Sequence, residues 1–269
     1  LVGSEMCIRD RPKRRKKIVL RKKKSPKAKK KSNFCELIMD FSGWEKLSLV
    51  DFDDYITTTL FSSGCNFRCP FCHNGPLVLH PESAPKIDFE RILDYLRKRK
   101  GVVEGVCISG GEPTLGDDLL DKMREIKALG YKIKLDSNGY RPEIIQKALD
   151  EGLVDYFAMD IKNSPDLYGK TCGLKDMDVS RIRQSIALIM GSGKEYEFRT
   201  TIIKEFHSVE SISEAAKMIQ GADKYFLQMY VDRDGCIEHG FHAVDKEEAE
   251  QMRKAASSFV KAAYLRNYD

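Results

Sequence analysis

Short apolar segments rich in β-branched and aromatic residues alternate along the chain with segments that carry apolar residues at helical spacing. The first pair is a strand expected at Tyr55–Phe61 and a helix that Asp88 would cap, with Ile92 and Leu96 on its apolar face. The pairing recurs at 105–109 and 117–129, 131–136 and 142–149, 154–161 and 179–190, 196–203 and 209–219, and 224–230 and 245–264. The pattern predicts an α/β protein.

Repeated strand-then-helix units predict a parallel sheet with right-handed crossovers. A partial barrel and an open, doubly wound sheet both fit the number of units, so the alternation does not decide between them. In both topologies ligands bind at the carboxyl ends of the strands. We therefore expect the functional side chains to come directly after strands.

Three cysteines follow the first expected strand with the spacing C-x3-C-x2-C: Cys65, Cys69 and Cys72. Soft thiolates select iron-sulfur clusters or zinc. A structural zinc site needs a fourth ligand, for which the adjacent His73 is awkwardly placed, and no second C-x2-C pair is present. Three thiolates on an iron-sulfur cube would leave one iron without a protein ligand.

Glycines and charged residues follow or end the later strands, as the rule for ligand sites in parallel sheets requires. The candidates are Gly110, Gly111 and Glu112 after the second strand, Asp136 and Ser137 at the third, Asp160 and Lys162 at the fourth, and Arg199 within the fifth.

The positive charge of the chain is confined to its beginning. The net charge is +5, yet residues 1–31 hold 15 of the 46 Lys and Arg residues and only two of the 41 acids, which leaves 31 basic against 39 acidic residues beyond them, a net of −8. Binding to nucleic acid is therefore not expected of the body of the protein. No apolar run is long enough for a membrane span, and no signal peptide is visible, so we expect a cytoplasmic protein with reduced thiols.

Residues 1–33 are expected to be a disordered basic tail, because a block of like charges cannot offset the entropy of ordering. The first eleven residues also resemble a translated sequencing adapter, in which case they would be an artefact. A polyanion-binding arm or a nuclear signal is the functional alternative. Residues 34–269 are expected to form the folded domain.

The cysteine spacing and the segment Ser109–Pro113 together resemble the radical S-adenosylmethionine (SAM) superfamily. The resemblance implies a partial (β/α)6 barrel of TIM type in which Cys65, Cys69 and Cys72 hold a 4Fe-4S cluster. It also implies that the open iron binds the methionine moiety of SAM, which one electron from the cluster cleaves to a 5′-deoxyadenosyl radical. Phe71 is interpreted either as a cover over the cluster and its ligand or as an ordinary apolar residue. Gly110 and Gly111, which lack side chains, would let the ligand approach the strand-end backbone, and Glu112 would accept hydrogen bonds from the methionine ammonium.

The segments Leu135–Gly139, Met159–Lys162 and Tyr196–Thr201 are similar to the activating enzymes of glycyl-radical proteins, above all that of anaerobic ribonucleoside-triphosphate reductase. This similarity implies that Asp136 and Lys162 contact SAM, with Ser137 beside them where Thr is usual. It further implies that Asp160 helps to hold a monovalent cation and that Arg199 meets a carboxylate. The alternative for these charges is a set of ion pairs at the barrel rim.

The resulting expectation is an enzyme that cleaves SAM reductively and generates a glycyl radical on anaerobic ribonucleoside-triphosphate reductase, with flavodoxin or ferredoxin as its electron donor. The alternatives are activation of another glycyl-radical enzyme of the pyruvate formate-lyase type, radical modification of a small molecule, or a zinc-bearing nucleic-acid-binding protein. Cys172 and Cys236, in expected loops, are interpreted as inert thiols. Asp53-Asp54 stands where the family tends to have Pro-Gly.

Overall fold

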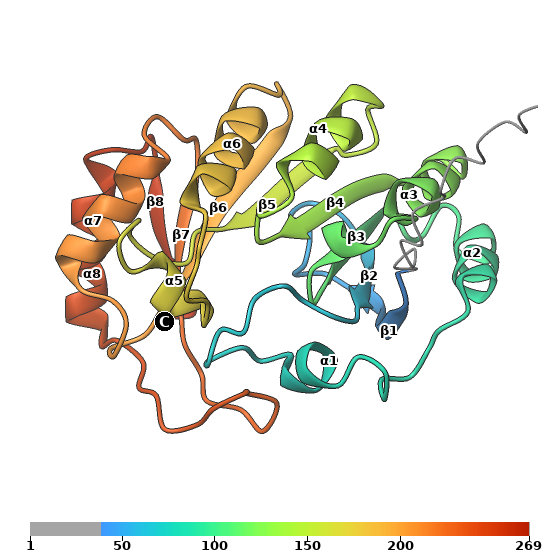
Figure 1. Cartoon of the computed structure of the whole chain (residues 1–269). Coiled ribbons are helices and arrows are strands. Elements are labelled where there is room, and N and C mark those ends of the chain that lie inside the picture. The colour runs from blue at the N-terminus through green and yellow to red at the C-terminus, as the bar shows by residue number, and fades with distance from the viewer. Residues whose placement is uncertain (1–38, 269) are drawn as a thin grey trace, which may run out of the picture. The chain divides into compact units, whose positions relative to one another are not determined.

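The computed structural model describes residues 39–268, and the tail expected at 1–33 lies outside them. This part of the chain forms one sheet flanked by helices (Figure 1). The strands are β1 (Phe41–Ser48), β2 (Thr57–Ser62), β3 (Gly105–Gly110), β4 (Lys132–Ser137), β5 (Tyr156–Asp160), β6 (Glu195–Ile202), β7 (Tyr225–Met229) and β8 (Ala263–Arg266). The helices are α1 (Gly75–Leu79), α2 (Phe89–Lys98), α3 (Leu119–Ala128), α4 (Pro142–Asp150), α5 (Tyr168–Cys172), α6 (Val179–Met190), α7 (Val209–Met218) and α8 (Lys246–Ser257), with a 3-10 turn η1 (Pro113–Leu115).

The order of the strands decides between the two topologies that the sequence left open. The sheet runs β1 to β8 in chain order, and every neighbouring pair from β2 to β8 is parallel. A doubly wound sheet would reverse its order at a switch point. Because the order never reverses, the crossovers all turn the same way, and the partial TIM-type barrel is confirmed.

The barrel is open because its two edge strands, β1 and β8, do not pair with each other. β1 runs antiparallel to β2 and was not expected from the sequence. The connection between them contains Asp54 at φ 67°, a left-handed conformation that favours glycine. The turn therefore keeps the conformation that glycine favours, although Asp stands at this position.

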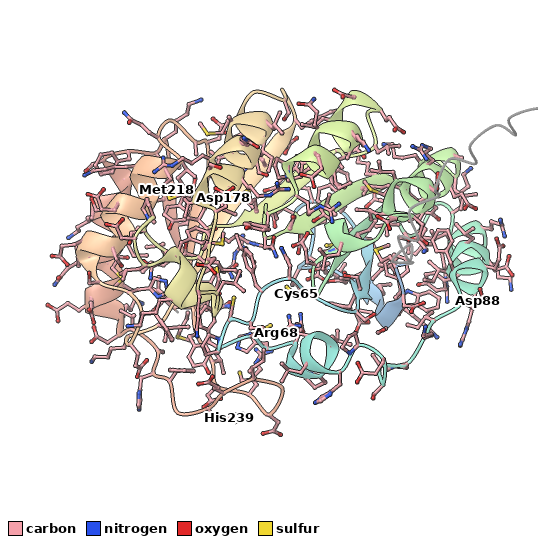
Figure 2. The ribbon with its side chains drawn as sticks, in the orientation of Figure 1. Cys65, Arg68, Asp88, Asp178, Met218 and His239 are labelled. Carbon is pink, nitrogen blue, oxygen red and sulfur yellow. The ribbon has the colours of Figure 1, made fainter. Side chains whose placement is uncertain are left out.

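Helix boundaries follow from local side-chain chemistry. The Asp88 carboxylate accepts a hydrogen bond from Glu90 N at 3.1 Å and begins α2, whose Ile92, Leu93 and Leu96 are buried against the sheet. Asp178 caps α6 in the same way (Figure 2). Both helices were expected, and α6 has the bounds that the sequence predicted.

The prediction of one helix over residues 245–264 is wrong for the second half of that range. α8 ends at Ser257, and Ala263–Arg266 forms β8, which pairs with β7. The short strand is stabilised by its parallel neighbour, which the spacing of apolar residues in its own sequence does not reveal. In the described residues no helix combines the length and apolar character needed to cross a membrane.

Candidate active site at the carboxyl ends of the strands

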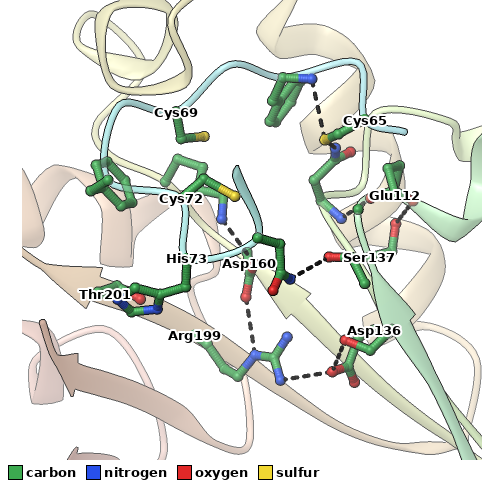
Figure 3. Close-up of a pocket in the computed structure, with 18 residues that line it drawn as sticks. Cys65, Cys69, Cys72, His73, Glu112, Asp136, Ser137, Asp160, Arg199 and Thr201 are labelled. Carbon is green, nitrogen blue, oxygen red and sulfur yellow. Dashed lines mark hydrogen bonds and ion pairs between the residues drawn. The ribbon is translucent and has the colours of Figure 1, made fainter. Parts of the chain in front are cut away.

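The three clustered cysteines lie on one loop, residues 63–74, which we call the cysteine loop. It leaves β2 and turns back so that Cys65, Cys69 and Cys72 line a single cavity at the carboxyl ends of the strands (Figure 3). Its backbone makes a turn in which Cys72 N donates to Cys69 O at 3.0 Å. The Cys65 sulfur accepts a hydrogen bond from Phe67 N at 3.3 Å and lies 3.8 Å from Asn138 Nδ2.

The outer side of the cysteine loop is held by a second loop, residues 230–241 after β7, which we call the C-terminal loop. Ile237 N donates to Cys72 O at 3.1 Å, and Glu238 N donates to Pro70 O at 2.8 Å. Arg68 and His239 mark these two loops in Figure 2. Phe71 is buried with its ring 5.6 Å from that of Phe206 and lines the cavity, a position that fits both a cover and an ordinary apolar residue.

Gly110 and Gly111 line the cavity, but the structure gives a further reason for these glycines. Gly110 has φ 115°, and a Cβ there would lie 2.2 Å from Ser62 N; at Gly111 it would lie 1.9 Å from Gly64 O. Gly111 N donates to Ser62 O at 2.8 Å. The glycines thus let the end of β3 pack directly on the start of the cysteine loop.

Glu112 is buried and connects the ends of β3 and β4. Its Oε1 accepts from Thr114 N at 3.1 Å and from Ser137 Oγ at 2.9 Å, and its Oε2 accepts from Asn138 N at 2.6 Å. Burial raises the pKa of Glu112, and these hydrogen bonds oppose that effect. Ser137, which was expected near the cofactor, therefore donates a hydrogen bond that holds the Glu112 carboxylate in place.

The charged residues of the cavity form a chain of ion pairs, the alternative that the sequence left open. Lys162 Nζ lies 2.9 Å from Asp160 Oδ2, Arg199 Nε lies 3.0 Å from Asp160 Oδ1, and Arg199 Nη1 lies 3.3 Å from Asp136 Oδ2. Burial acts to raise the pKa of Asp160, but the charges of Lys162 and Arg199 outweigh it and lower the pKa to about 2. Both oxygens of Asp160 are already paired, so a cation there would have to compete with two side chains.

One carboxylate oxygen of Asp136 accepts no hydrogen bond from the protein. Its Oδ2 accepts from Ser109 Oγ at 3.0 Å, whereas its buried Oδ1 has no hydrogen-bond partner and lies 3.9 Å from Lys134 Nζ. An unpaired buried oxygen is costly unless a bound group supplies a donor. Its position in the cavity wall fits a polar ligand with hydroxyl or ammonium donors.

The thiols share the cavity without converging on one point. Within residues 39–268 no three Cys, His, Asp or Glu side chains are arranged to hold a single metal ion. Tetrahedral zinc would require sulfur atoms all about 2.3 Å from one centre. The three cysteines that line this cavity are the ligand type that holds iron-sulfur clusters.

Every residue that the sequence selected for this site lines the cavity. The sequence did not assign a role in cofactor binding to the other lining residues, which are Phe67, His73, Asn74, Ser109, Asn138 and Thr201. Thr201 had a usable signal, because it lies two residues after Arg199 on β6 and so faces the same side of the strand. Asn138 lies within a motif that was recognised, but its contact with Cys65 depends on the fold.

Residues 59–219 match the radical SAM superfamily, and the chain belongs to that superfamily. Among its relatives is a protein of Methanocaldococcus jannaschii provisionally named a glycyl-radical enzyme activating enzyme, 29% identical over 84% of this chain and 95% of the relative. The pyruvate formate-lyase-activating enzyme of Clostridium pasteurianum is 29% identical over 78% of this chain and 93% of its own length. The resemblance to the activating-enzyme group is confirmed at this level.

The fold is similar to that of Streptococcus suis SuiB bound to S-adenosylmethionine, with a TM-score of 0.60 and 16% identity. That match covers 76% of this chain and 48% of SuiB, so the chain spans about half the length of that protein. Radical SAM enzymes use a 4Fe-4S cluster and SAM, and these are the cofactors of this enzyme.

Proposed function

We propose that this enzyme activates a glycyl-radical protein, and that its target is anaerobic ribonucleoside-triphosphate reductase. The observation that supports the reaction most directly is the convergence of three cysteines and the charged ends of β3 to β6 on one cavity. Similarity to activating enzymes over most of the chain supports the type of target.

Cys65, Cys69 and Cys72 are the proposed ligands of the cluster, which with SAM supplies the one-electron cleavage that yields the hydrogen-abstracting radical. Around it, the chain orients the cofactors. Hydrogen bonds from Phe67 N and Asn138 Nδ2 stabilise negative charge on the Cys65 sulfur. The free Oδ1 of Asp136 accepts from SAM.

Glu112, Lys162 and Arg199 are proposed to recognise the methionine end of SAM. Glu112 Oε2 accepts one hydrogen bond from the protein and retains capacity for the ammonium group. Lys162 and Arg199 present cations to a carboxylate. Their present pairing with Asp160 holds both side chains at the cavity before the ligand arrives.

The open barrel suits a protein substrate. A glycine of a folded protein reaches the cavity only if a backbone loop enters, and a barrel with unpaired β1 and β8 leaves an open side. The described residues contain no second group of clustered cysteines that could pass electrons to the site. Flavodoxin or ferredoxin is therefore the proposed electron donor.

Pyruvate formate-lyase is a second candidate target, supported by the relative from Clostridium pasteurianum. Both targets present a backbone glycine, and the cavity residues described above serve either one. Which of the two target proteins is activated therefore depends on the surfaces of this enzyme that contact the target.

The first experiment tests the cofactors. Anaerobic reconstitution with iron and sulfide should give about four irons per chain. With dithionite and SAM the reconstituted enzyme should release 5′-deoxyadenosine. Stoichiometric zinc without release of 5′-deoxyadenosine would overturn the proposed function. It would favour the alternative of a zinc-bearing nucleic-acid-binding protein.

The second experiment tests the target. The reconstituted enzyme is mixed separately with anaerobic ribonucleoside-triphosphate reductase and with pyruvate formate-lyase, and glycyl radical is measured by electron paramagnetic resonance. We expect a signal on the reductase that is absent with Cys69→Ala. A signal on pyruvate formate-lyase alone would transfer the proposal to that target, and no signal on either beside normal SAM cleavage would reject both.

A further inference from the structure

A buried histidine joins the chain after β6 to the chain after β5. His207 follows the turn at 203–206 and is the one buried residue among the five histidines of the sequence, all of which the structure describes. Its Nε2 lies 2.9 Å from the backbone oxygen of Lys162, two residues beyond the end of β5. The Lys162 side chain lines the active-site cavity, whereas His207 does not. The ring is therefore placed to act on the cavity through the backbone of Lys162.

The neighbours of His207 decide which ring nitrogen carries the proton. Ile203 N donates to Nδ1 at 3.0 Å, and because a backbone N–H can only donate, Nδ1 must present a lone pair. Ile203 O lies 3.3 Å from Nδ1, but it already accepts from Phe206 N at 3.1 Å and from His207 N at 2.9 Å. Burial lowers the pKa of His207, and the charge of Lys162 acts in the same direction, so the ring is neutral at neutral pH. Its proton is then on Nε2, which donates to Lys162 O.

A second hydrogen bond joins the same two segments in the opposite direction. Asn163 is completely buried, and its Nδ2 donates to Phe206 O at 2.8 Å. Each segment therefore supplies one side-chain donor and one backbone acceptor. When His207 is replaced, the bond from Asn163 still connects the two segments, so the protein should fold while Lys162 O loses its donor.

Three successive backbone oxygens at the end of β5 each accept a hydrogen bond from a different side chain. Along residues 160–162 the donors are Tyr168, Thr200 and His207, at 3.3, 2.5 and 2.9 Å. Tyr168 lies in α5, a helix that the sequence did not predict. The backbone that carries the side chains of Asp160 and Lys162 into the cavity is thus held from three sides.

We propose that His207 is a positioning residue: by donating to Lys162 O it fixes the lysine that recognises the methionine carboxylate of SAM. The inference rests on the proposed function, in which Lys162 presents its charge to that carboxylate. A lysine side chain has many rotamers, so a fixed backbone and the ion pair with Asp160 at 2.9 Å reduce the entropy that is lost when the ligand binds. No bond is made or broken, because the histidine acts only through its hydrogen bond.

The test uses two substitutions that each retain one of the two hydrogen bonds of the ring. The amide of Asn extends as far as Nδ1 and can accept from Ile203 N, whereas the amide of Gln extends as far as Nε2 and can donate to Lys162 O. Calorimetric titration of the reconstituted enzyme with SAM measures the affinity. His207→Asn should bind SAM about three- to tenfold more weakly, the loss expected for one hydrogen bond. His207→Gln should restore most of the affinity.

Decarboxylated SAM separates positioning from a general structural defect, because it lacks the group that Lys162 recognises. The wild type and His207→Asn should bind this compound with equal affinity. His242→Asn is the matched control. His242 is exposed and contacts the same turn, with its Nδ1 2.7 Å from Glu205 Oε1, so its replacement should change neither affinity.

Unchanged SAM affinity in His207→Asn would overturn the inference, and so would an equal loss for SAM and decarboxylated SAM, an equal loss in His242→Asn, or a Gln variant that binds no better than the Asn variant. A wild-type enzyme that holds its cluster but binds no SAM would reject the proposed function itself, which is a different result.

A second measurement covers the case in which the His207 variants do not fold. Nitrogen NMR of the histidine rings in wild-type holoenzyme with the oxidised cluster shows which nitrogen of each ring carries the proton. His207 can be recognised as the buried ring whose N–H exchanges slowly with solvent. A proton on Nε2 supports the hydrogen bond to Lys162 O, and a proton on Nδ1 would reject it.

Discussion

Asp160 and Arg199 are register partners on the neighbouring parallel strands β5 and β6, and Arg199 Nε lies 3.0 Å from Asp160 Oδ1. Lys162 Nζ lies 2.9 Å from the other oxygen of the same carboxylate, Oδ2. The single carboxylate of Asp160 thus forms ion pairs with two cationic side chains in the wall of the active site. Its replacement should affect both stability and the response to acid.

Asp160→Asn should lower the free energy of unfolding at neutral pH by about 2 kcal/mol, because Lys162 and Arg199 both lose their negative partner and one of them loses its acceptor oxygen. The folded pKa of Asp160 is about 2, below the unfolded value of about 3.9. The contribution of the pair is therefore present above about pH 4 and is lost as the pH falls toward about 2. Urea unfolding of both proteins at neutral and acidic pH measures the difference, which should narrow in acid.

Asp121→Asn is the control for Asp160→Asn. Asp121 pairs with Arg124 on the exposed surface of α3, so its loss should cost less than about 1 kcal/mol. A stability difference for Asp160→Asn that stayed constant across the acidic range would contradict the pairing.

Gly110→Ala should destabilise the protein more than Gly130→Ala. Both glycines have positive φ, at 115° and 90°, but a Cβ at Gly110 would meet the backbone of Ser62 whereas nothing lies within 4 Å at Gly130. Gly130→Ala should therefore cost about 1–2 kcal/mol from its backbone conformation alone, and Gly110→Ala about 1–3 kcal/mol more from overpacking. Equal thermal shifts would show that the contact with β2 is unimportant.

Glu112→Gln should weaken SAM binding about tenfold, the equivalent of about 1.4 kcal/mol. An amide nitrogen would replace a carboxylate oxygen that accepts from Asn138 N or Ser137 Oγ, and two donors would then face each other. Calorimetric titration of reconstituted protein with SAM gives the affinity. Glu143→Gln, at an exposed position on α4, is the control and should bind SAM as the wild type does.

Glu197 and Arg266 should be coupled across β6 and β8. Arg266 Nη2 lies 3.0 Å from Glu197 Oε2, and this carboxylate is almost fully buried. A double-mutant cycle with Glu197→Gln and Arg266→Gln should give a coupling energy of about 1–3 kcal/mol in urea unfolding. Additive effects would mean that Glu197 and Arg266 do not stabilise each other in the folded protein.

Removing residues 1–33 should leave reductive cleavage of SAM unchanged, because every residue assigned to the cavity lies between Cys65 and Thr201. The rate of 5′-deoxyadenosine release by the shortened and full chains provides the comparison. A large loss of rate would give the basic tail a role in catalysis.

The sequence predicted the sheet well because each parallel strand is a short apolar run followed by an amphipathic helix. It missed β1, whose residues Phe41–Ser48 include a glycine and several polar side chains, and β8, which continues directly from a helical pattern. It also missed α5, which has only five residues. Short elements such as these are stabilised by neighbours that are distant in the sequence.

The cavity was predicted more completely than its interactions. The rule that ligands bind at strand ends selected Asp136 and Arg199, yet their ion pair joins residues 63 positions apart. Likewise the backbone hydrogen bond from Arg68 N to Cys172 O depends on how α5 packs against the cysteine loop. The spacing of apolar residues in the sequence shows which side of a strand a side chain lies on. Which side chains then pair across the cavity depends on the curvature of the whole sheet.

The hydrogen bond from Ile237 N to Cys72 O also limits when the cysteine loop can reach its final structure during synthesis. The cysteine loop precedes its backbone partners Ile237 and Glu238 by a long stretch of chain that includes β3 to β7. The loop cannot reach its final backbone pairing until the ribosome has made the chain through Glu238. A nascent chain that ends before this residue would therefore lack the outer support of its cluster site.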